Sequence, residues 1–470
     1  MSLIANQCTY ACGDQILQAT IHLEPGQTKA IYGPSGSGKS TLFRLLSGLG
    51  PDSFITGDYQ IDGQDVATYP IRQRAETVSL LFQNPDTQFC MQTPREELYF
   101  CLENRCIAAE EMEDRVENIL VFCEIGHLAD RPFHQLSGGE KQLAALACCL
   151  IMESRYLLLD EPFANLDIAS KLKIIQKIST WQQESHIGIL LIDHQINDVT
   201  DWVNSWYLLE SQCKEVDTSV ILRLHDKNHQ ALTAPPTVVS SQHVHLTLKD
   251  VSYSAGDQTI VFPDKSFHGG EIIGITGQSG IGKSTFLKVL LQQHPYDGSV
   301  FVQSKILKKS NVAFDHMSWI MQNPQDQFIA TTVSEELKVS GSEDLVPTIL
   351  ADINLLHQSE KSPFLLSQGQ QRRLAVASLI QRPVDILLVD EPTYGQDIKQ
   401  AWQIMMMLHQ VAAKGTLVLI VSHDQSLLQS FCSQIIDFNQ FVKENNDEKN
   451  QSKRQTFHDF GHRVAHFFSK

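Results

Sequence analysis

The chain of 470 residues carries one set of short motifs twice, in the same order. Each set has a glycine-rich loop of the form G-x-x-x-x-G-K-S, a glutamine, a Leu-Ser-x-Gly segment, an Asp-Glu pair and a histidine. The two copies lie at residues 33–40, 83, 136–140, 160–161 and 194, and at residues 277–284, 322, 366–370, 390–391 and 423. The separation of matching positions drifts from 244 (33 to 277) to 230 (160 to 390) and 229 (194 to 423), which indicates a duplicated domain with small deletions.

The composition is that of an ordinary globular chain, with 42% hydrophobic and 19% charged residues. Each half has about 235 residues, which is enough for a core of its own. No apolar run approaches the roughly 18 residues that a membrane-spanning helix needs, so we expect a chain that does not cross a bilayer. The formal charge of −17 disfavours a broad basic surface, and nucleic acid is not an expected partner. Ten cysteines without C-x-x-C spacing, and no secretory signal, favour a reducing cytoplasmic compartment.

Short apolar segments of β type precede the motifs in both halves. They lie at residues 30–32, 156–159 and 189–192, and again at 272–275, 386–389 and 417–421. This pattern predicts two α/β domains, each with a mostly parallel core sheet, and places the motifs at the carboxyl ends of strands, where such sheets bind ligands. We expect domains at 1–225 and 243–440, a polar linker at 226–242 and a tail at 441–470. Apolar residues at helical spacing in the tail favour a helix packed on its own domain over a docking surface for a membrane partner.

The glycine-rich loop has a defined chemistry, because its backbone amides surround phosphate oxygens at the start of a helix. Lys39 and Lys283 are expected to neutralise the β- and γ-phosphates. The hydroxyls of Ser40 and Ser284 and the carboxylates of Asp160 and Asp390 are expected to hold Mg²⁺. The ATP-binding loop residues are Gly33, Ser35, Gly36, Gly38, Lys39, Ser40 and Thr41, and Gly277, Ser279, Gly280, Gly282, Lys283, Ser284 and Thr285.

The catalytic residues are expected to follow the aspartates. Glu161 and Glu391 are expected to orient and deprotonate the attacking water. The alternative is that each glutamate only supports neighbouring site residues and takes no part in catalysis. His194 and His423 end the next apolar strand in each half, where an imidazole is able to hydrogen-bond the γ-phosphate.

These motifs together resemble the ATP-binding-cassette family over nearly the whole chain, because the Leu-Ser-Gly-Gly-type signature distinguishes it from other phosphate-loop enzymes. The resemblance implies two cassettes that face head to tail, each ATP lying between the phosphate loop of one and the signature of the other. One site would combine Lys39, Ser40, Gln83, Asp160, Glu161 and His194 with Ser367 and Gly369; the other would combine Lys283, Ser284, Gln322, Asp390, Glu391 and His423 with Ser137 and Gly139. Gln83 and Gln322 would join the Mg²⁺ ligands. Tyr10 and Tyr253 match the position where the family stacks an aromatic ring on adenine, unless they are simply strand residues.

Several positions depart from the family pattern. Gln368 stands where the signature has glycine, and Glu140 replaces the usual signature glutamine. Residues 394–397 read Tyr-Gly-Gln-Asp where residues 164–167 have the more typical Ala-Asn-Leu-Asp, and Asp193 precedes the first histidine. We therefore expect two unequal ATP sites.

Residues 82–89 and 321–328 continue each glutamine turn as Phe/Met-Gln-Asn-Pro and end in Gln-Phe, soon followed by Glu-Glu-Leu. This resembles the ATPases of energy-coupling-factor importers, in which a cassette pair drives a transmembrane coupling subunit and a small membrane protein that binds a vitamin or a metal such as cobalt. A fused, duplicated ATPase of this length is similar to the ATPases of importers for thiamine or its hydroxymethylpyrimidine precursor. The resemblance implies a peripheral protein at the cytoplasmic face of the membrane, which needs no homodimer. The alternatives are a soluble twin cassette acting on ribosomes or nucleic acid, the fused ATPase of another importer class, and a non-catalytic scaffold gated by nucleotide.

Overall fold

The computed structural model describes residues 2–12, 15–48, 54–163, 166, 168–193, 195–230, 241–256, 258–307, 310–393 and 395–443. The chain divides into two compact units between Lys227 and Asn228. Part of the stretch expected to be a linker is regular structure, since helix α7 runs over Thr218–Gln230 and strand β11 begins at Ser241. Residues 231–240 and the tail beyond 443 lie outside the described residues. None of the described helices combines the length and apolar character needed to span a bilayer.

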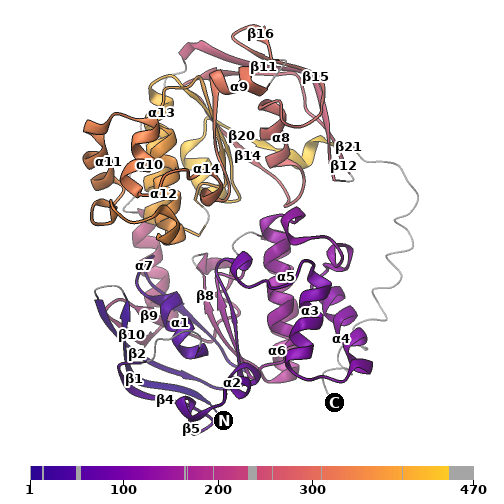
Figure 1. Cartoon of the computed structure of the whole chain (residues 1–470), viewed down its shortest axis with the longest axis vertical. Helices are drawn as coiled ribbons and strands as arrows, with labels where there is room; N and C mark the ends of the chain where they lie inside the picture. Colours follow the sequence, from indigo (N-terminus) through magenta and orange to yellow (C-terminus); the bar gives the residue numbers. More distant parts are fainter. Residues whose placement is uncertain are drawn as a thin grey trace. The chain divides into compact units, whose positions relative to one another are not determined.

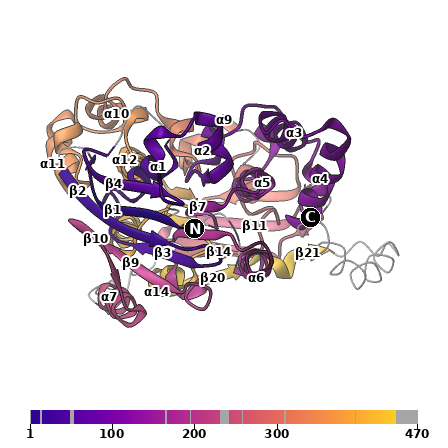
Figure 2. The ribbon, with the colours of Figure 1, turned by 90° about the horizontal axis from the view of Figure 1, so that it is seen from below.

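The first unit is built on one sheet whose described strands run in the order β5-β4-β1-β2-β10-β9-β3-β8-β7-β6 (Figures 1 and 2). The strands are β1 (Leu3–Cys12), β2 (Gln15–Leu23), β3 (Thr28–Tyr32), β4 (Thr56–Ile61), β5 (Gln64–Asp65), β6 (Val78–Leu81), β7 (Tyr156–Asp160), β8 (Gly188–Ile192), β9 (Ser205–Leu209) and β10 (Gln212–Val216). The β9-β3-β8-β7-β6 portion is parallel, as the apolar segments predicted, while β1, β2, β4 and β5 pair antiparallel.

Strand β7 shows how the sheet is held in place. Leu157 and Leu159 belong to one hydrophobic core, whereas Tyr156 and Leu158 belong to the other. Successive side chains of a strand point to opposite faces, so a strand that is apolar at every position is covered on both sides. The covering helices are α1 (Lys39–Ser47), α2 (Ile71–Thr77), α3 (Pro94–Asn104), α4 (Ala109–Phe122), α5 (Gly138–Ile151) and α6 (Ile168–Ser185). Helices α3, α4 and α5 contact one another and form a helical subdomain that carries the signature (Figure 1).

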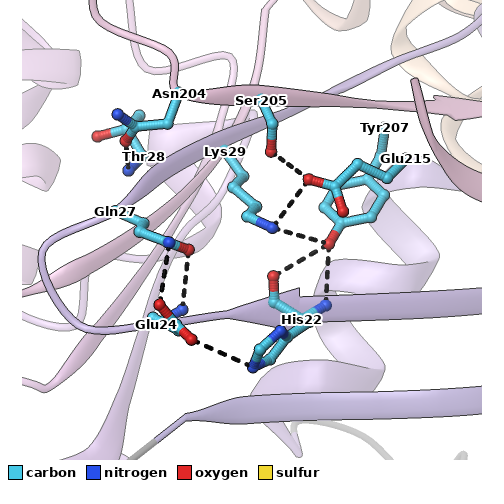
Figure 3. A network of polar contacts seen from close by, with 9 residues as sticks. All are labelled: His22, Glu24, Gln27, Thr28, Lys29, Asn204, Ser205, Tyr207 and Glu215. Atoms are coloured by element: carbon cyan, nitrogen blue, oxygen red, sulfur yellow. Dashed lines mark hydrogen bonds and ion pairs between the residues drawn. The ribbon is translucent and has the colours of Figure 1, made fainter. Parts of the chain in front are cut away.

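A polar network joins the antiparallel and parallel parts of this sheet (Figure 3). The Lys29 ammonium on β3 donates to Glu215 Oε1 on β10 at 3.0 Å and to the Tyr207 hydroxyl on β9 at 3.5 Å. That hydroxyl also accepts from the His22 backbone amide at 2.9 Å and donates to the His22 carbonyl at 3.0 Å. Because the lysine is buried, these partners are needed to hold its charge.

The second unit divides the same elements between two sheets. One has β16-β15-β11-β12-β21 with β13 paired to β11, and the other is the parallel sheet β17-β18-β19-β14-β20. Their bounds are β11 (Ser241–Ala255), β12 (Gln258–Val261), β13 (Lys265–Gly269), β14 (Ile272–Thr276), β15 (Asp297–Val302), β16 (Lys305–Ile306), β17 (Met317–Ile320), β18 (Ile386–Asp390), β19 (Leu417–Val421), β20 (Gln434–Asp437) and β21 (Val442–Lys443). The position of Lys29 is occupied here by Ile273, which lies in an apolar core.

The helices of the second unit follow the order of the first. They are α8 (Lys283–Leu290), α9 (Ser310–His316), α10 (Val333–Ser340), α11 (Val346–Asp352), α12 (Gln368–Leu379), α13 (Ile398–Ala413) and α14 (Gln425–Phe431). Helices α10, α11 and α12 form a second helical subdomain, with its own apolar core (Figure 1). The mixed α/β architecture with two cassette-like units agrees with the fold expected from the repeated motifs.

Candidate functional site

The two phosphate loops connect β3 to α1 and β14 to α8, so each loop lies between the carboxyl end of a parallel strand and the start of a helix. Gly38 and Gly282, which precede the helices, have φ of 90° and 103°. A side chain would be strained there, and a Cβ on Gly38 would lie 2.5 Å from Leu17 Cδ1. The loop therefore needs glycine at this position.

The loop lysines are held over the loops themselves. Lys39 Nζ donates to the carbonyls of Gly33 and Pro34, each at 2.8 Å. Lys283 Nζ makes the same pair of contacts with Gly277 and Gln278, also at 2.8 Å. Both ammonium groups therefore lie against the backbone of the loop that is expected to surround a phosphate chain.

Glu161 and Glu391 share an unusual backbone conformation at the ends of β7 and β18. Their φ angles are 51° and 49°, in a region that costs a residue with a side chain roughly 1–2 kcal/mol. The strain is opposed by a hydrogen bond from each backbone amide to the carbonyl of Ile192 or Val421, at 2.9 Å in both units. Strained residues held in this way are concentrated at functional sites.

The glutamine turn and the signature helix also reach the glutamates. Gln83 Nε2 donates to Glu161 Oε1 at 2.8 Å. On α5, Gln142 donates to the Glu161 carbonyl at 3.3 Å, and on α12 Arg372 takes the same place and donates to the Glu391 carbonyl. Sequence reasoning did not single out Gln142 and Arg372, although both lie six residues after the signature leucine.

In the second unit the histidine and the glutamate lie together. His423 Nε2 is 3.5 Å from Glu391 Oε1. Burial raises the pKa of Glu391 to about 8, although the nearby Lys283 charge opposes this. Burial also raises the pKa of Asp390, against a hydrogen bond from Ser284. These shifts result from taking carboxyl groups out of water.

The second unit fits a divalent cation. Asp390 Oδ1 is buried and has no hydrogen-bond partner among the residues that the structure describes. The Ser284 hydroxyl reaches the same side chain. A hard cation such as Mg²⁺ takes carboxylate and hydroxyl oxygens, so Asp390 and Ser284 are suitable ligands. Asp160 and Ser40 occupy the matching positions of the first unit, and Asp160 is equally buried.

The structure contradicts the expectation that Tyr10 and Tyr253 stack on adenine. Their exposed fractions are 0% and 3%, so neither ring has a free face. Their hydroxyls instead donate to the carbonyls of Gly38 and Gly282, at 3.4 and 3.0 Å. Both tyrosines lie on inward-facing strand positions and support the phosphate loop from below.

The glutamine turns contain a second pair of residues that match in both units. Gln88 Oε1 accepts from the Phe82 amide at 3.3 Å, and Gln88 Nε2 donates to Cys149 Sγ of α5 at 3.5 Å. Gln327 Oε1 accepts from Met321 at 3.2 Å and its amide donates to a carbonyl of α12 at 3.0 Å. These side chains point into their own unit and join the turn to the signature helix. The sequence repeat includes both residues, since each lies five positions after the turn glutamine.

Some expected site residues lie outside the described residues. They are His194, the segment residues Ala164, Asn165 and Asp167, and Tyr394. Cys148 and Cys149 of α5 are buried free thiols that form no disulfide.

Two separated stretches of the chain, residues 16–164 and 264–394, match the family described as ABC transporter. The chain belongs to the ABC transporter family. The matched stretches contain the phosphate loop, signature and acidic strand end of both units, so this ABC protein is a duplicated cassette and an ATPase.

Two curated relatives match this ABC protein over most of its length and most of their own. It is 32% identical over 89% of its length, and 85% of the relative's, to the putative HMP/thiamine import ATP-binding protein YkoD of Bacillus subtilis. It is 30% identical over 90% of its length, and 91% of the relative's, to a putative ABC transporter ATP-binding protein of Treponema denticola. Among solved structures it is similar to the archaeal ribosome recycling factor aABCE1 in complex with the stalk protein aP1, at a TM-score of 0.62 and 20% identity over 92% of this chain and 87% of that one. That last similarity supports the fold alone.

Proposed function

We propose that this ABC ATPase is the motor subunit of an importer of the energy-coupling-factor type. Its ATP binding and hydrolysis would drive uptake of a vitamin or metal ion through separate membrane subunits, at the cytoplasmic face of the membrane. The observation that carries the proposal is the similarity along nearly the whole chain to a relative named as an HMP/thiamine import ATP-binding protein. Thiamine or its precursor is therefore the first substrate to test.

The ATP sites are proposed to be composite. Lys39, Ser40, Gln83, Asp160, Glu161 and His194 would act with Ser367 and Gly369, and Lys283, Ser284, Gln322, Asp390, Glu391 and His423 with Ser137 and Gly139. Nucleotide would then favour the closed pair, and hydrolysis would release it. Covalent duplication supplies both halves in equal amounts.

The chemistry follows from the glutamates. A bound Mg²⁺ would neutralise charge on the β- and γ-phosphates. Each glutamate would accept a proton from the attacking water, and both have the same left-handed backbone at the end of their strand. The Gln83 amide, which donates to Glu161 at 2.8 Å, would orient this carboxylate.

The surface for the transmembrane coupling subunit is proposed to lie after each glutamine turn. A buried carboxylate shapes it in both units: Glu97 Oε2 accepts from the amides of Cys90 and Met91 at 2.8 and 2.7 Å, and Glu336 Oε2 accepts from Ile329 and Ala330 at 3.0 and 2.8 Å. The bend presents apolar side chains to solvent, because Met91 is 37% and Ile329 75% exposed. Within the same segments Gln88 hydrogen-bonds Cys149 and Phe328 is buried, so these two side chains pack inside their own units.

The experiment is co-purification of the full chain with its membrane subunits after the double change Met91→Asp and Ile329→Asp. We expect most of the complex to be lost, while the basal ATPase activity of the isolated chain stays within about twofold, since surface changes rarely alter stability. Ile306→Asp, at an exposed position of the sheet-edge strand β16, is the matched control. An unchanged yield of complex in the double variant would show that this surface does not bind the coupling subunit.

A further inference from the structure

The two signature serines begin helices in the same way but with different partners. Ser137 is the N-cap of α5 and Ser367 the N-cap of α12, and both form capping boxes with the residue three positions later. That residue is Glu140 in the first unit and Gln370 in the second. Glutamate and glutamine both complete a capping box, so the helix start alone does not require the difference.

The difference changes what the serine hydroxyl does. Glu140 Oε2 lies 2.7 Å from the Ser137 backbone nitrogen and 2.8 Å from Ser137 Oγ. An ionised carboxylate only accepts hydrogen bonds, so the Ser137 hydroxyl donates its proton to Glu140. The hydroxyl is thereby already committed within its own helix turn.

Ser367 is arranged differently. Gln370 Oε1 accepts from the Ser367 backbone amide at 3.0 Å, and Ser367 Oγ accepts from the Gln370 amide at 3.4 Å. Among the described residues no acceptor takes the Ser367 hydroxyl proton within hydrogen-bond distance. The hydroxyl of the second signature is therefore available as a donor, and the amide beside it carries no charge.

The charge of Glu140 is not balanced by its lysine neighbour. Lys141 Nζ lies 2.7 Å from Asp86 Oδ1 in the glutamine turn, and is engaged there. In the second unit the corresponding residue is the neutral Gln371, which donates to the Pro363 carbonyl at 3.1 Å. The first signature thus presents a carboxylate where the second presents an amide.

We propose that Glu140 is a tuning residue that weakens ATP-driven closure at the site completed by the first signature. It withholds the Ser137 hydroxyl and sets a negative charge beside the γ-phosphate, whereas Ser367 and Gln370 offer a donor without that charge. This inference rests on the composite sites of the proposed function, in which Ser137 completes the site of Lys283 and Glu391. The two ATP sites would then differ in affinity for a reason that lies in their signatures.

The experiment exchanges the two residues, as Glu140→Gln and as the mirror change Gln370→Glu, in the full chain. The sites are separated by making each exchange in a Glu161→Gln and in a Glu391→Gln background, and the KM for ATP of the remaining turnover is measured. Glu140→Gln is expected to lower this KM roughly 5- to 10-fold in the Glu161→Gln background and not in the other. Gln370→Glu is expected to raise the KM by a similar factor in the Glu391→Gln background. Thermal unfolding should be unchanged in both, because the capping box is retained.

A second measurement tests the hydroxyl directly. Ser367→Ala should lower kcat/KM about 10-fold or more, as the loss of a phosphate donor does. Ser137→Ala should cost no more than about 3-fold in the native chain, and about 10-fold once Glu140→Gln has released the hydroxyl.

The outcomes separate this inference from the function on which it rests. If the effect of Glu140→Gln appears in the Glu391→Gln background instead, each signature serves its own unit; the composite sites fail while the role of Glu140 stands. If Ser367→Ala lowers kcat/KM in the Glu391→Gln background but Glu140→Gln changes the KM in neither background, the composite sites stand and the role of Glu140 is refuted.

Discussion

The backbone amide of Glu161 donates to the carbonyl of Ile192 at 2.9 Å, and Glu391 makes the same bond to Val421. Each accepting residue lies two positions before a histidine expected in the site, so the end of the glutamate strand is joined to the end of the histidine strand in both units. The left-handed backbone at each glutamate accompanies this contact. The hydrogen bond compensates for the backbone strain in both units.

The first prediction concerns these glutamates. The double variant Glu161→Gln, Glu391→Gln should bind ATP yet lose steady-state hydrolysis by about 100-fold or more, because the proposed general base is removed while the phosphate loops are untouched. Nucleotide binding and phosphate release should be measured on the same preparation. Hydrolysis at the native rate would show that the base lies elsewhere.

A second prediction concerns a buried ion cluster of the first unit. Lys171 Nζ lies 3.2 Å from Asp193 and 3.1 Å from Asp198, and its side chain is 2% exposed. The matching residues of the second unit are Ala401, Ser422 and Leu427. Lys171→Met should lower the free energy of unfolding by about 3 kcal/mol, because it leaves the buried Asp193 and the partly buried Asp198 without their cation.

The triple change Lys171→Ala, Asp193→Ser, Asp198→Leu is the control for that cluster. It installs the combination that the second unit already uses, so most of the lost stability should return. Urea unfolding of the three proteins compares them. Equal stability of native and Lys171→Met chains would mean that the cluster contributes nothing.

The third prediction is a pH dependence of the network in Figure 3. Burial would raise the pKa of Glu215, but hydrogen bonds from Ser205 and Lys29 outweigh it and lower that pKa. A carboxyl whose pKa is lowered by folding stabilises the folded state above its ordinary pKa, near 4.5, and loses this effect as the pH falls through the folded value. The stability difference between the native chain and Glu215→Gln should therefore be larger at pH 7 than at pH 3. A difference independent of pH would exclude the ionised pair as its source.

The fourth prediction concerns the carboxylates behind the proposed partner surface. Glu336→Ala leaves the amides of Ile329 and Ala330 without their acceptor, so we expect a loss of about 1–3 kcal/mol in stability together with weaker association with the membrane subunits. Glu335→Ala, on the exposed side of the same helix turn, serves as the comparison. Complex yield and thermal midpoint should be recorded for both. If the Glu336→Ala variant associated with the membrane subunits as fully as the native chain, this carboxylate would have no role in partner binding.

The sequence predicted the α/β fold and the strand-end location of most motifs because both depend on local patterns. Apolar runs identify buried strands, and a phosphate loop works through its own backbone. The prediction that Tyr10 stacks on adenine was wrong, because a motif position does not show which face of the strand is buried. The contact of Gln142 and Arg372 with the glutamate carbonyls was missed for a related reason, since it joins residues 19 positions apart through the packing of a helix on a sheet.

By itself, then, the sequence determined that the chain has two units with the same phosphate-loop, signature and acidic motifs, because these are short motifs repeated at a nearly constant interval. The sequence also showed which residues differ between the units, but only the tertiary structure decided which contacts those differences change. The hydroxyl of Ser137 donates to Glu140 while that of Ser367 does not donate to Gln370, and β10 pairs with both β2 and β9 in the first unit, whereas the second unit has two separate sheets. Such differences depend on which polar atoms meet inside each fold, and a hydrogen bond or buried charge is decided by distances of a few ångströms that no motif encodes.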